Sequence, residues 1–390
     1  MDYRILSLSI GSKEYNGLFK NQELSSGSLI WSGNARPIPQ VRAGFNRFIA
    51  IPGTNGWIQI KGNLSFGKFL DDNWLKSHFN YDNSFITTNV WYHQKQVFFR
   101  SKESKPFILT IGGEFAAQFE GDNETYDYGE LISSSKDQLK LKDFFNVLIP
   151  RGGDGSNSLG DKVYYYGNHL GAWHAIGEYH FKDKSILRGY FEWLFEDGSG
   201  IGKLNGWDGL WGIDYHLTNQ KLLTDIVVEY LQTTNQSGPI HWAPNDTPGT
   251  HITTQATGAD DYYNNYNYNG WTHYGMCNGS PMIRSTAYNK DGYLRIKDNR
   301  IKAYHIGLAG MLNSQLAYKM LASYRESWGT PFLPSLEIRH DFSMLMQLKY
   351  YPKNIKGLEV NCKFGLDRGN LYSDNTGFSI GFSYSNNLIK

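Results

Sequence analysis

The feature that most constrains this fold is a persistent alternation of apolar and polar residues with a period of two. In residues 107–119 one face reads Phe, Leu, Ile, Gly, Phe, Ala, Phe, while the other carries Thr110, Glu114 and Gln118. The same alternation recurs in residues 187–196, 339–350, 358–367 and 378–384. Successive side chains of a β-strand point to opposite faces, so this period predicts strands with one apolar and one polar face. We therefore expect an all-β fold.

The length of these segments and the charges on their polar faces separate two kinds of all-β fold. The strands of a soluble sandwich are usually about 5 to 6 residues long, whereas these segments run for about 9 to 12. At about 3.3 Å per residue and a tilt near 45°, such a strand crosses the apolar slab of a membrane. In a transmembrane barrel the charged faces of the strands would line a water-filled lumen, and the aromatic faces would contact lipid. We predict a transmembrane antiparallel outer-membrane β-barrel in preference to a soluble β fold.

Fourteen segments carry the alternation, and the connections between them are of two kinds. The predicted strands lie near 3–10, 41–51, 57–67, 89–99, 107–119, 171–181, 186–196, 209–217, 223–233, 303–311, 316–326, 339–350, 357–366 and 376–385. Long and short connections alternate without exception along the chain. Because outer-membrane barrels have short periplasmic turns and long extracellular loops, we expect 182–185 and 312–315 in the periplasm and the long connections, 11–40 among them, outside. Residues 1–390 are interpreted as one barrel domain, in which 234–302 is the longest extracellular loop.

The composition of that longest loop indicates what it could bind. Between Thr234 and Ile283 there is no Lys or Arg, and the whole chain is nearly neutral, with 38 Lys and Arg against 37 Asp and Glu. Nucleic acids require cations, so we expect no nucleic-acid partner. A sugar instead requires flat aromatic faces and amide or carboxylate groups for its hydroxyls. The simpler alternative is that the loop folds over itself as a polar lid. The residues predicted to contact polysaccharide are Asp260, Asp261, Tyr262, Tyr263, Tyr266, Tyr268 and Trp271, with Trp242 and Trp328 as neighbours.

Other patterns that could carry chemistry are weak. The predicted lumen holds carboxylates that could in principle flank a glycosidic bond: Glu192, Glu196, Asp225 and Glu229. A polar lumen is expected to contain such pairs by chance, so we predict no catalytic residues. His174, Glu178 and His180 share one face of their strand, but their spacing fits no strong metal motif. Cys277 and Cys362 have neither metal nor redox spacing. We predict no metal and no cofactor.

Three stretches of the chain resemble a known family. They are SSGSLIWSGNARPIPQ at 25–40, NGWTHYG at 269–275 and YRESWGTP at 324–331. They resemble the Wzi family of capsule-assembly proteins, its Bacteroidetes branch in particular, and the likeness covers nearly the whole chain. The resemblance implies an integral barrel of the cell outer membrane that acts as a lectin, tethers capsular polysaccharide at the cell surface and is not an enzyme. It also implies outer-membrane lipid, lipopolysaccharide and the capsule export machinery as partners.

The chain departs from the family pattern on its N-terminal side. The family barrel has about eighteen strands and follows a signal peptide, so fourteen strands from Met1 onward suggest that about four strands and the leader lie upstream. Two rival functions stay open at this point. The same barrel would act as an outer-membrane porin or sugar-selective channel if its lumen were open, and as a membrane-embedded hydrolase if two lumen carboxylates acted on a bound substrate.

Overall fold

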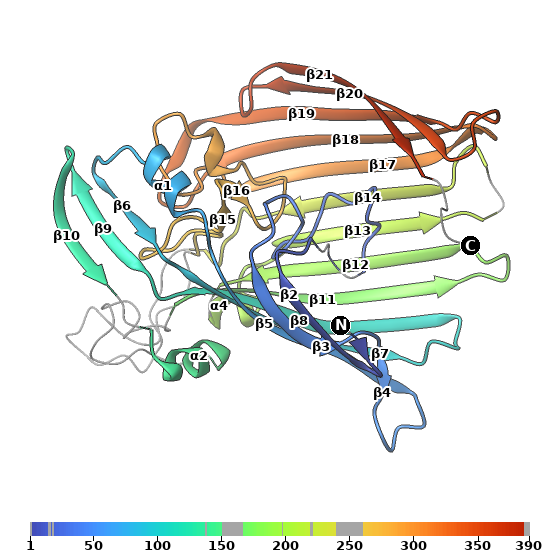
Figure 1. The fold of residues 1–390 in the computed structure, drawn as a ribbon, viewed down its shortest axis with the longest axis horizontal. Helices are drawn as coiled ribbons and strands as arrows, with labels where there is room; N and C mark the ends of the chain where they lie inside the picture. Colours follow the sequence, from blue (N-terminus) through green and yellow to red (C-terminus); the bar gives the residue numbers. More distant parts are fainter. Residues whose placement is uncertain are drawn as a thin grey trace.

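A large antiparallel sheet makes up most of the molecule (Figure 1). The computed structural model describes residues 2–14, 17, 19–136, 139–149, 167–196, 198–218, 221–238 and 260–385. Within these residues the sheet has 16 strands, which pair in chain order except that β4 pairs with β5 alone. They are β1 (Asp2–Tyr3), β2 (Leu6–Gly11), β3 (Gln40–Phe45), β4 (Ile49–Ala50), β5 (Ile58–Lys68), β7 (Trp91–Ser101), β8 (Phe107–Phe119), β11 (Asn168–His180), β12 (Ile186–Phe195), β13 (Gly209–His216), β14 (Asp225–Gln232), β17 (Ile301–Asn313), β18 (Leu316–Gly329), β19 (Pro334–Tyr350), β20 (Leu358–Gly369) and β21 (Asn375–Tyr384).

Each predicted strand coincides with a strand of this sheet, except that the predicted strands 3–10 and 41–51 are each divided in two, into β1 and β2 and into β3 and β4. The prediction of a large antiparallel all-β sheet is confirmed. Pairing runs without a break from β1 to β21, and no pairing among the described residues joins β21 back to β1 or β2.

Four of the long connections contain structure of their own. The other elements are a three-stranded sheet of β6 (Ser84–Thr88), β9 (Asp122–Asp127) and β10 (Glu130–Lys136), the pair β15 (Thr272–His273) and β16 (Met276–Cys277), and the short helices α1 (Asp72–His78), α2 (Leu141–Leu148), α4 (Gly198–Ile201) and η1 (Thr286–Tyr288). Residues 68–88 and 120–170 supply the three-stranded sheet, α1 and α2. None of the helices in the described part of the chain is both long and apolar enough to span a membrane.

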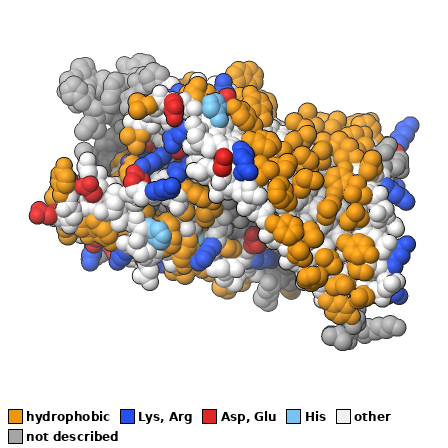
Figure 2. All heavy atoms as spheres, turned by 90° about the horizontal axis from the view of Figure 1, so that it is seen from above, with side chains coloured by type: hydrophobic (Ala, Val, Ile, Leu, Met, Phe, Trp, Pro, Cys, Tyr) orange, Lys and Arg blue, Asp and Glu red, His pale blue; other side chains and the backbone are white. Residues whose placement is uncertain are grey.

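The two faces of the main sheet carry side chains in the reverse of the pattern of a water-soluble protein. On β8, Phe107, Leu109 and Ile111 are 54%, 44% and 50% exposed, whereas Thr110 and Glu114 on the opposite face are each 4% exposed. Figure 2 shows hydrophobic side chains gathered over the sheet, with Lys and Arg beyond them at one end. So large an apolar surface is unfavourable in water and suits hydrocarbon. We call this the outer face of the sheet.

The connections sort by length at the two ends of the sheet. Helices α1 and α2 and the β6–β9–β10 sheet all lie at one end, which we call the loop end (Figure 1). At the other end, the turn end, β11 and β12 are joined by residues 181–185 and β17 and β18 by residues 314–315. Outer-membrane barrels have this arrangement, and their long loops are extracellular.

Residues 19–39, which we call the inner strap, run through the space inside the curved sheet. The ring of Phe19 lies 4.9 Å from that of Phe98 on β7, and the backbone N–H of Leu29 donates to Glu192 on β12 at 2.9 Å. On β17 the imidazole of His305 bonds to the carbonyl of Leu24 at 2.7 Å. Since one short segment contacts strands from β7 to β17, the sheet must wrap around it.

The position of the inner strap differs from our expectation that residues 11–40 lie outside the barrel. The physical reason is that inward-facing carboxylates need donors once water is displaced. The strap approaches the wall so closely that a Cβ added to Gly307 would lie 2.6 Å from the carbonyl oxygen of Leu24. A glycine at this position lets the two backbones meet.

The hydrophobic core also lies inside the sheet, toward the loop end. It joins apolar residues of the strap, of the wall and of the long 234–302 loop. The indole N–H of Trp271 donates to the carbonyl of Ile30 at 3.0 Å, and the hydroxyl of Tyr263 donates to the carbonyl of Leu29 at 2.7 Å. The loop and the strap therefore form one packed body that fills the interior.

Candidate functional site

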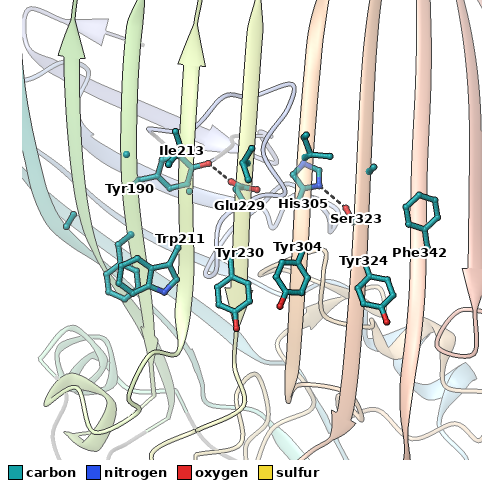
Figure 3. A pocket seen from close by; sticks show the side chains of 17 residues that line it. Tyr190, Trp211, Ile213, Glu229, Tyr230, Tyr304, His305, Ser323, Tyr324 and Phe342 are labelled. Carbon is teal, nitrogen blue, oxygen red and sulfur yellow. Dashed lines mark hydrogen bonds between the residues drawn. The ribbon is translucent and has the colours of Figure 1, made fainter.

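Glu229 on β14 is a principal anchor of the inner strap. One carboxylate oxygen accepts hydrogen bonds from the Ser25 hydroxyl at 2.7 Å and the Tyr190 hydroxyl at 2.5 Å, the latter drawn in Figure 3. The other oxygen accepts the backbone N–H of Ser26 at 2.6 Å. The Glu229 side chain is 2% exposed. Buried carboxylates require such donors, and this one is fully supplied.

Glu192, on β12, is the second anchor. It lies 2.8 Å from the ammonium of Lys20, accepts the backbone N–H of Leu29, and lies 3.3 Å from Nδ1 of His174 on β11. The side chains of Lys20 and Glu192 are 6% and 3% exposed, so this ion pair is shielded from solvent. Breaking such a pair is costly because it leaves one buried charge without a partner.

Two of the four lumen carboxylates that could in principle flank a glycosidic bond, Glu192 and Glu229, are thus engaged in holding the strap. Their oxygens already accept hydrogen bonds from strap and wall donors. In the described ranges no group of three or more His, Cys, Asp or Glu residues is arranged to hold a metal ion. The geometry of this interior is that of a polar interface between wall and plug.

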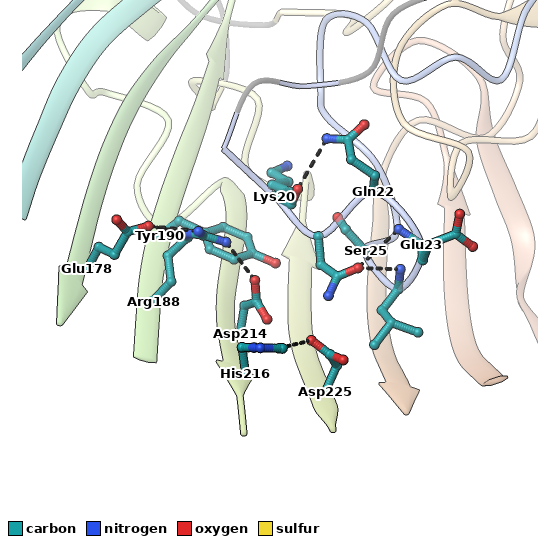
Figure 4. A network of polar contacts seen from close by, with 12 residues as sticks. Lys20, Gln22, Glu23, Ser25, Glu178, Arg188, Tyr190, Asp214, His216 and Asp225 are labelled. Atoms are coloured by element: carbon teal, nitrogen blue, oxygen red, sulfur yellow. Dashed lines mark hydrogen bonds and ion pairs between the residues drawn. The ribbon is translucent and has the colours of Figure 1, made fainter. Parts of the chain in front are cut away.

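A second polar network lies on the wall toward the turn end (Figure 4). Arg188 donates to Glu178 at 2.7 Å and to Asp214 at 2.7 Å, so it bridges β11 and β13. His216 on β13 contacts Asp225 on β14 at 2.7 Å. These pairs neutralise inward-facing charges between adjacent strands, and they are less deeply buried than the strap anchors.

The structure separates the residues that we predicted to contact polysaccharide. Five of them are buried: Asp260, Tyr262, Tyr263, Tyr268 and Trp271. In the same loop Asp261 is half-buried and Tyr266 is exposed. Trp328 is half-buried on β18, and Trp242 lies outside the described residues. A fully buried ring cannot stack on a sugar while the loop keeps this conformation. The buried members therefore act in packing here, and a direct binding role for them stays a prediction.

The hydrogen bonds of the two acidic members show how the loop is held. The carboxylate of Asp260 accepts the hydroxyl of Ser237 at 2.7 Å, and that of Asp261 accepts the amide of Asn299 at 2.6 Å. Burial raises the pKa of the Asp261 carboxyl, which the Asn299 hydrogen bond partly opposes. Burial also raises the pKa of Tyr263 well above its ordinary value, so its hydroxyl stays protonated and can donate.

Tyr266 is the exposed member of the predicted set, at 45% exposure. Its neighbours Asn265 and Asn267 are half-buried, and the carbonyl of Asn267 accepts the hydroxyl of Thr87 at 2.6 Å and the amide of Asn123 at 3.1 Å. These contacts attach the loop to β6 and β9 and hold the Tyr266 ring at the loop end. We call Tyr266, Asn265, Asn267 and Asn123 the Tyr266 surface. It presents one aromatic face beside several amides.

Trp328 lies in the wall, where its backbone N–H donates to the carbonyl of Arg300 at the end of the 234–302 loop. It lies near the end of β18, and the ammonium of Lys302 on β17 is 5.7 Å from its ring centroid. The buried loop residues Tyr263 and Trp271 contact the strap inside the sheet instead. The structure therefore does not join Trp328 to the predicted loop site.

A cavity of about 820 Å³ lies on the outer face of the sheet (Figure 3). Five aromatic side chains form a row across β13, β14, β17, β18 and β19, which we call the aromatic row: Trp211, Tyr230, Tyr304, Tyr324 and Phe342. Aromatic belts of this kind mark the level of the membrane–water interface. This cavity opens toward hydrocarbon, so it is not a polysaccharide site.

Sequence reasoning missed the inner strap and its anchors as the organising feature of the interior. The apolar run of Leu29, Ile30 and Trp31 inside a supposed extracellular loop is the signal that could have revealed it. A water-exposed loop has no need for three consecutive large apolar residues, whereas a segment packed inside a sheet does.

Comparisons with known proteins support the fold. The sequence matches no protein-family profile and no curated protein. Among solved structures, Wzi of Escherichia coli, an outer-membrane protein involved in group 1 capsule assembly and a carbohydrate-binding β-barrel, has a TM-score of 0.55 and 12% sequence identity. The match covers 98% of this chain and 67% of that chain.

Other solved structures are less similar. OmpT of Vibrio cholerae, expressed in the outer membrane, has a TM-score of 0.30 and 7% identity over 98% of this chain and 77% of that chain. CdiB from Acinetobacter baumannii has a TM-score of 0.33 and 11% identity over 88% of this chain and 50% of that chain. TM-scores this low do not by themselves indicate a shared fold. The chain has the fold of an outer-membrane β-barrel.

Proposed function

We propose that this protein is an integral outer-membrane lectin that holds capsular polysaccharide at the cell surface and catalyses no reaction. The observation that carries the proposal is the filled interior, where the strap is anchored by Glu229 and Glu192 and packed under Trp271. A plug with so many buried hydrogen bonds disfavours a transport role. The loop end is then the part of the barrel that a large external ligand can reach.

The chemistry of the Tyr266 surface supports a sugar as that ligand. A half-exposed phenol ring offers a flat face for the C–H side of a pyranose, and the adjacent amides can donate to and accept from hydroxyls. The loop around it has no cation from Thr234 to Ile283, so phosphate-rich polymers are poor candidates. The resemblance to Wzi adds capsular polysaccharide as the specific class, with lipopolysaccharide and the capsule export machinery as further partners.

The test uses the purified protein and short oligosaccharides cut from the capsule of the same organism. Short fragments avoid the avidity of the polymer, which would mask a single weak contact. We expect Tyr266→Ala to weaken binding about fivefold, since one aromatic stacking contact contributes on the order of 1 kcal/mol. The matched control is Tyr288→Ala, because Tyr288 is 46% exposed and its ring packs against Tyr372, outside the Tyr266 surface.

Two results would count against the proposal. Equal affinity of Tyr266→Ala and the unaltered protein would remove the Tyr266 surface as the binding site. Failure of the unaltered protein to bind any capsule fragment in an isothermal titration, while the barrel remains folded, would remove the lectin function itself.

A further inference from the structure

Helix α2 lies against the outer face of the barrel. The ring of Phe144 is 5.2 Å from Phe66 on β5, 5.7 Å from Trp91 on β7 and 5.6 Å from Phe119 on β8. Val147, one turn further along the helix, is fully buried in the same cluster. The side chains of Phe66, Trp91 and Phe119 belong to the set that points away from the strap, so the helix packs on the side of the sheet that is exposed to lipid elsewhere.

A second face of α2 is apolar, and no residue that the structure describes covers it. Leu141, Phe145 and Ile149 are 82%, 70% and 57% exposed and follow one another at intervals of four residues. At about 100° per residue they form one stripe adjacent to the packed face. The remaining arc carries Lys142, Asn146 and the buried Asp143. The apolar surface of the helix thus runs from the face packed on the barrel wall to the exposed stripe, and the polar residues lie on the remaining side.

The packed face covers polar groups that would otherwise meet hydrocarbon. Lys95 on β7 points outward, and its ammonium donates to the carbonyl of Leu148 at the C-terminal end of the helix. A cation is favourable there because it meets the unpaired carbonyls and the negative end of the helix dipole. His93, two residues earlier, is 1% exposed and pairs across the ladder with Ala117, which lies in the Val147 cluster.

The level of α2 matches the membrane surface. Its contacts Trp91 and Phe119 are cross-strand partners at the loop end of β7 and β8. The aromatic row lies near the loop end of other strands of the same sheet, at the level expected of an interfacial belt. A helix at this depth, with one face on the barrel, has lipid as the neighbour of its outer stripe.

We infer that α2 is an interfacial helix whose stripe of Leu141, Phe145 and Ile149 inserts among the outer-leaflet lipids of the membrane that holds the barrel. Its packed face seals Lys95 and His93 from those lipids. The occupant is lipid because the stripe is continuous with the outer apolar face of the sheet, and amphipathic helices lie in interfaces with their apolar face toward the acyl chains and their polar arc toward water. The inference rests on the fold and not on the proposed binding of polysaccharide.

The test places a fluorophore on each side of the helix. Phe145→Cys and the control Asn146→Cys, in a Cys362→Ala background, carry an environment-sensitive label, and Cys277 is fully buried. The proteins are reconstituted in vesicles of phosphatidylethanolamine and phosphatidylglycerol that contain nitroxide-labelled lipids. We expect the label at Phe145 to be quenched severalfold more by nitroxides near the headgroups than the label at Asn146, and severalfold less by aqueous iodide.

Equal quenching of both labels by iodide would overturn the inference, because the stripe would then lie in water. Protection of the Phe145 label that disappears when the protein is diluted within the vesicles would also overturn it, since a second copy would then be the occupant. A separate readout is tryptic cleavage after Lys142. Phe145→Asp should accelerate it severalfold relative to Asn146→Asp while the barrel keeps its heat-modifiable mobility in gels, and equal rates would contradict insertion.

Discussion

Removal of the Glu229 carboxylate should release the inner strap. In Glu229→Ala the Ser25 and Tyr190 hydroxyls and the Ser26 N–H lose a charged acceptor. Hydrogen bonds to a charged group are each worth about 1.5–3 kcal/mol. These are not additive, and removal of a buried charge recovers some desolvation energy, so we expect a net cost of about 3–5 kcal/mol.

That cost converts into a measurable rate. A change of about 4 kcal/mol multiplies the population of undocked strap by roughly a thousandfold. Proteolysis tracks the open population when opening and closing are fast. Trypsin should therefore cleave after Lys20, whose side chain is 6% exposed in the docked strap, up to about a thousandfold faster in Glu229→Ala. Mass spectrometry of the new chain ends identifies the cut.

Two further variants make the prediction specific. Glu229→Gln keeps one oxygen for the two hydroxyls but turns an N–H toward the Ser26 N–H, so the rate should rise by about ten- to a hundredfold. Asp225→Ala, on the same strand and face, removes only the contact with His216 and should leave the rate nearly unchanged. If Glu229→Ala and Asp225→Ala are cleaved at the same rate, the carboxylate does not hold the strap.

Two other measurements check the loop end. Burial raises the pKa of the Asp71 carboxyl to about 6, although the hydrogen bond from the Tyr274 N–H opposes this rise. The protonated carboxyl therefore stabilises the fold below pH 3.8, and this stabilisation is lost as the pH rises through 6. Deuterium exchange over α1, corrected for intrinsic rates, should therefore be faster at pH 7 than at pH 5. The free energy of opening that it reports should fall by no more than roughly 3 kcal/mol. An unchanged pH dependence in Asp71→Asn would refute this. Trp271→Ala should lower the free energy of unfolding in vesicles by about 3–5 kcal/mol, because the ring is fully buried and its N–H bonds to Ile30, whereas Trp271→Phe should cost clearly less. Equal losses in urea titrations would contradict a packing role.

The position of the strands could be predicted because alternation is a local property. Side chains two residues apart share a face whatever the rest of the chain does. Thus Phe107, Leu109 and Ile111 are exposed on the outer face and Glu114 is buried on the inner one, as the period of two indicates. The segregation of long and short connections likewise needs only the order of the strands.

The interior could not be predicted, because it depends on contacts between residues far apart in sequence. Tyr263 donates to Leu29, which lies 234 residues away. Phenols and amides that could bind a sugar can equally satisfy buried backbone groups, so composition alone does not distinguish the two uses. The absence of Lys and Arg around Trp271 suits a sugar site, but burial in a core requires the same absence.

What the sequence determined by itself is therefore the wall: which residues form strands, which side chains face outward, and which ends carry the loops. Only the tertiary structure decided which segments fill the space inside the wall and which helix packs on its outer face. Leu29 and Trp271 meet only once the sheet has curved around the strap, and Lys95 finds its acceptor only when α2 docks. The strand pattern is fixed by the geometry of neighbouring residues, whereas these contacts depend on the closure of long loops.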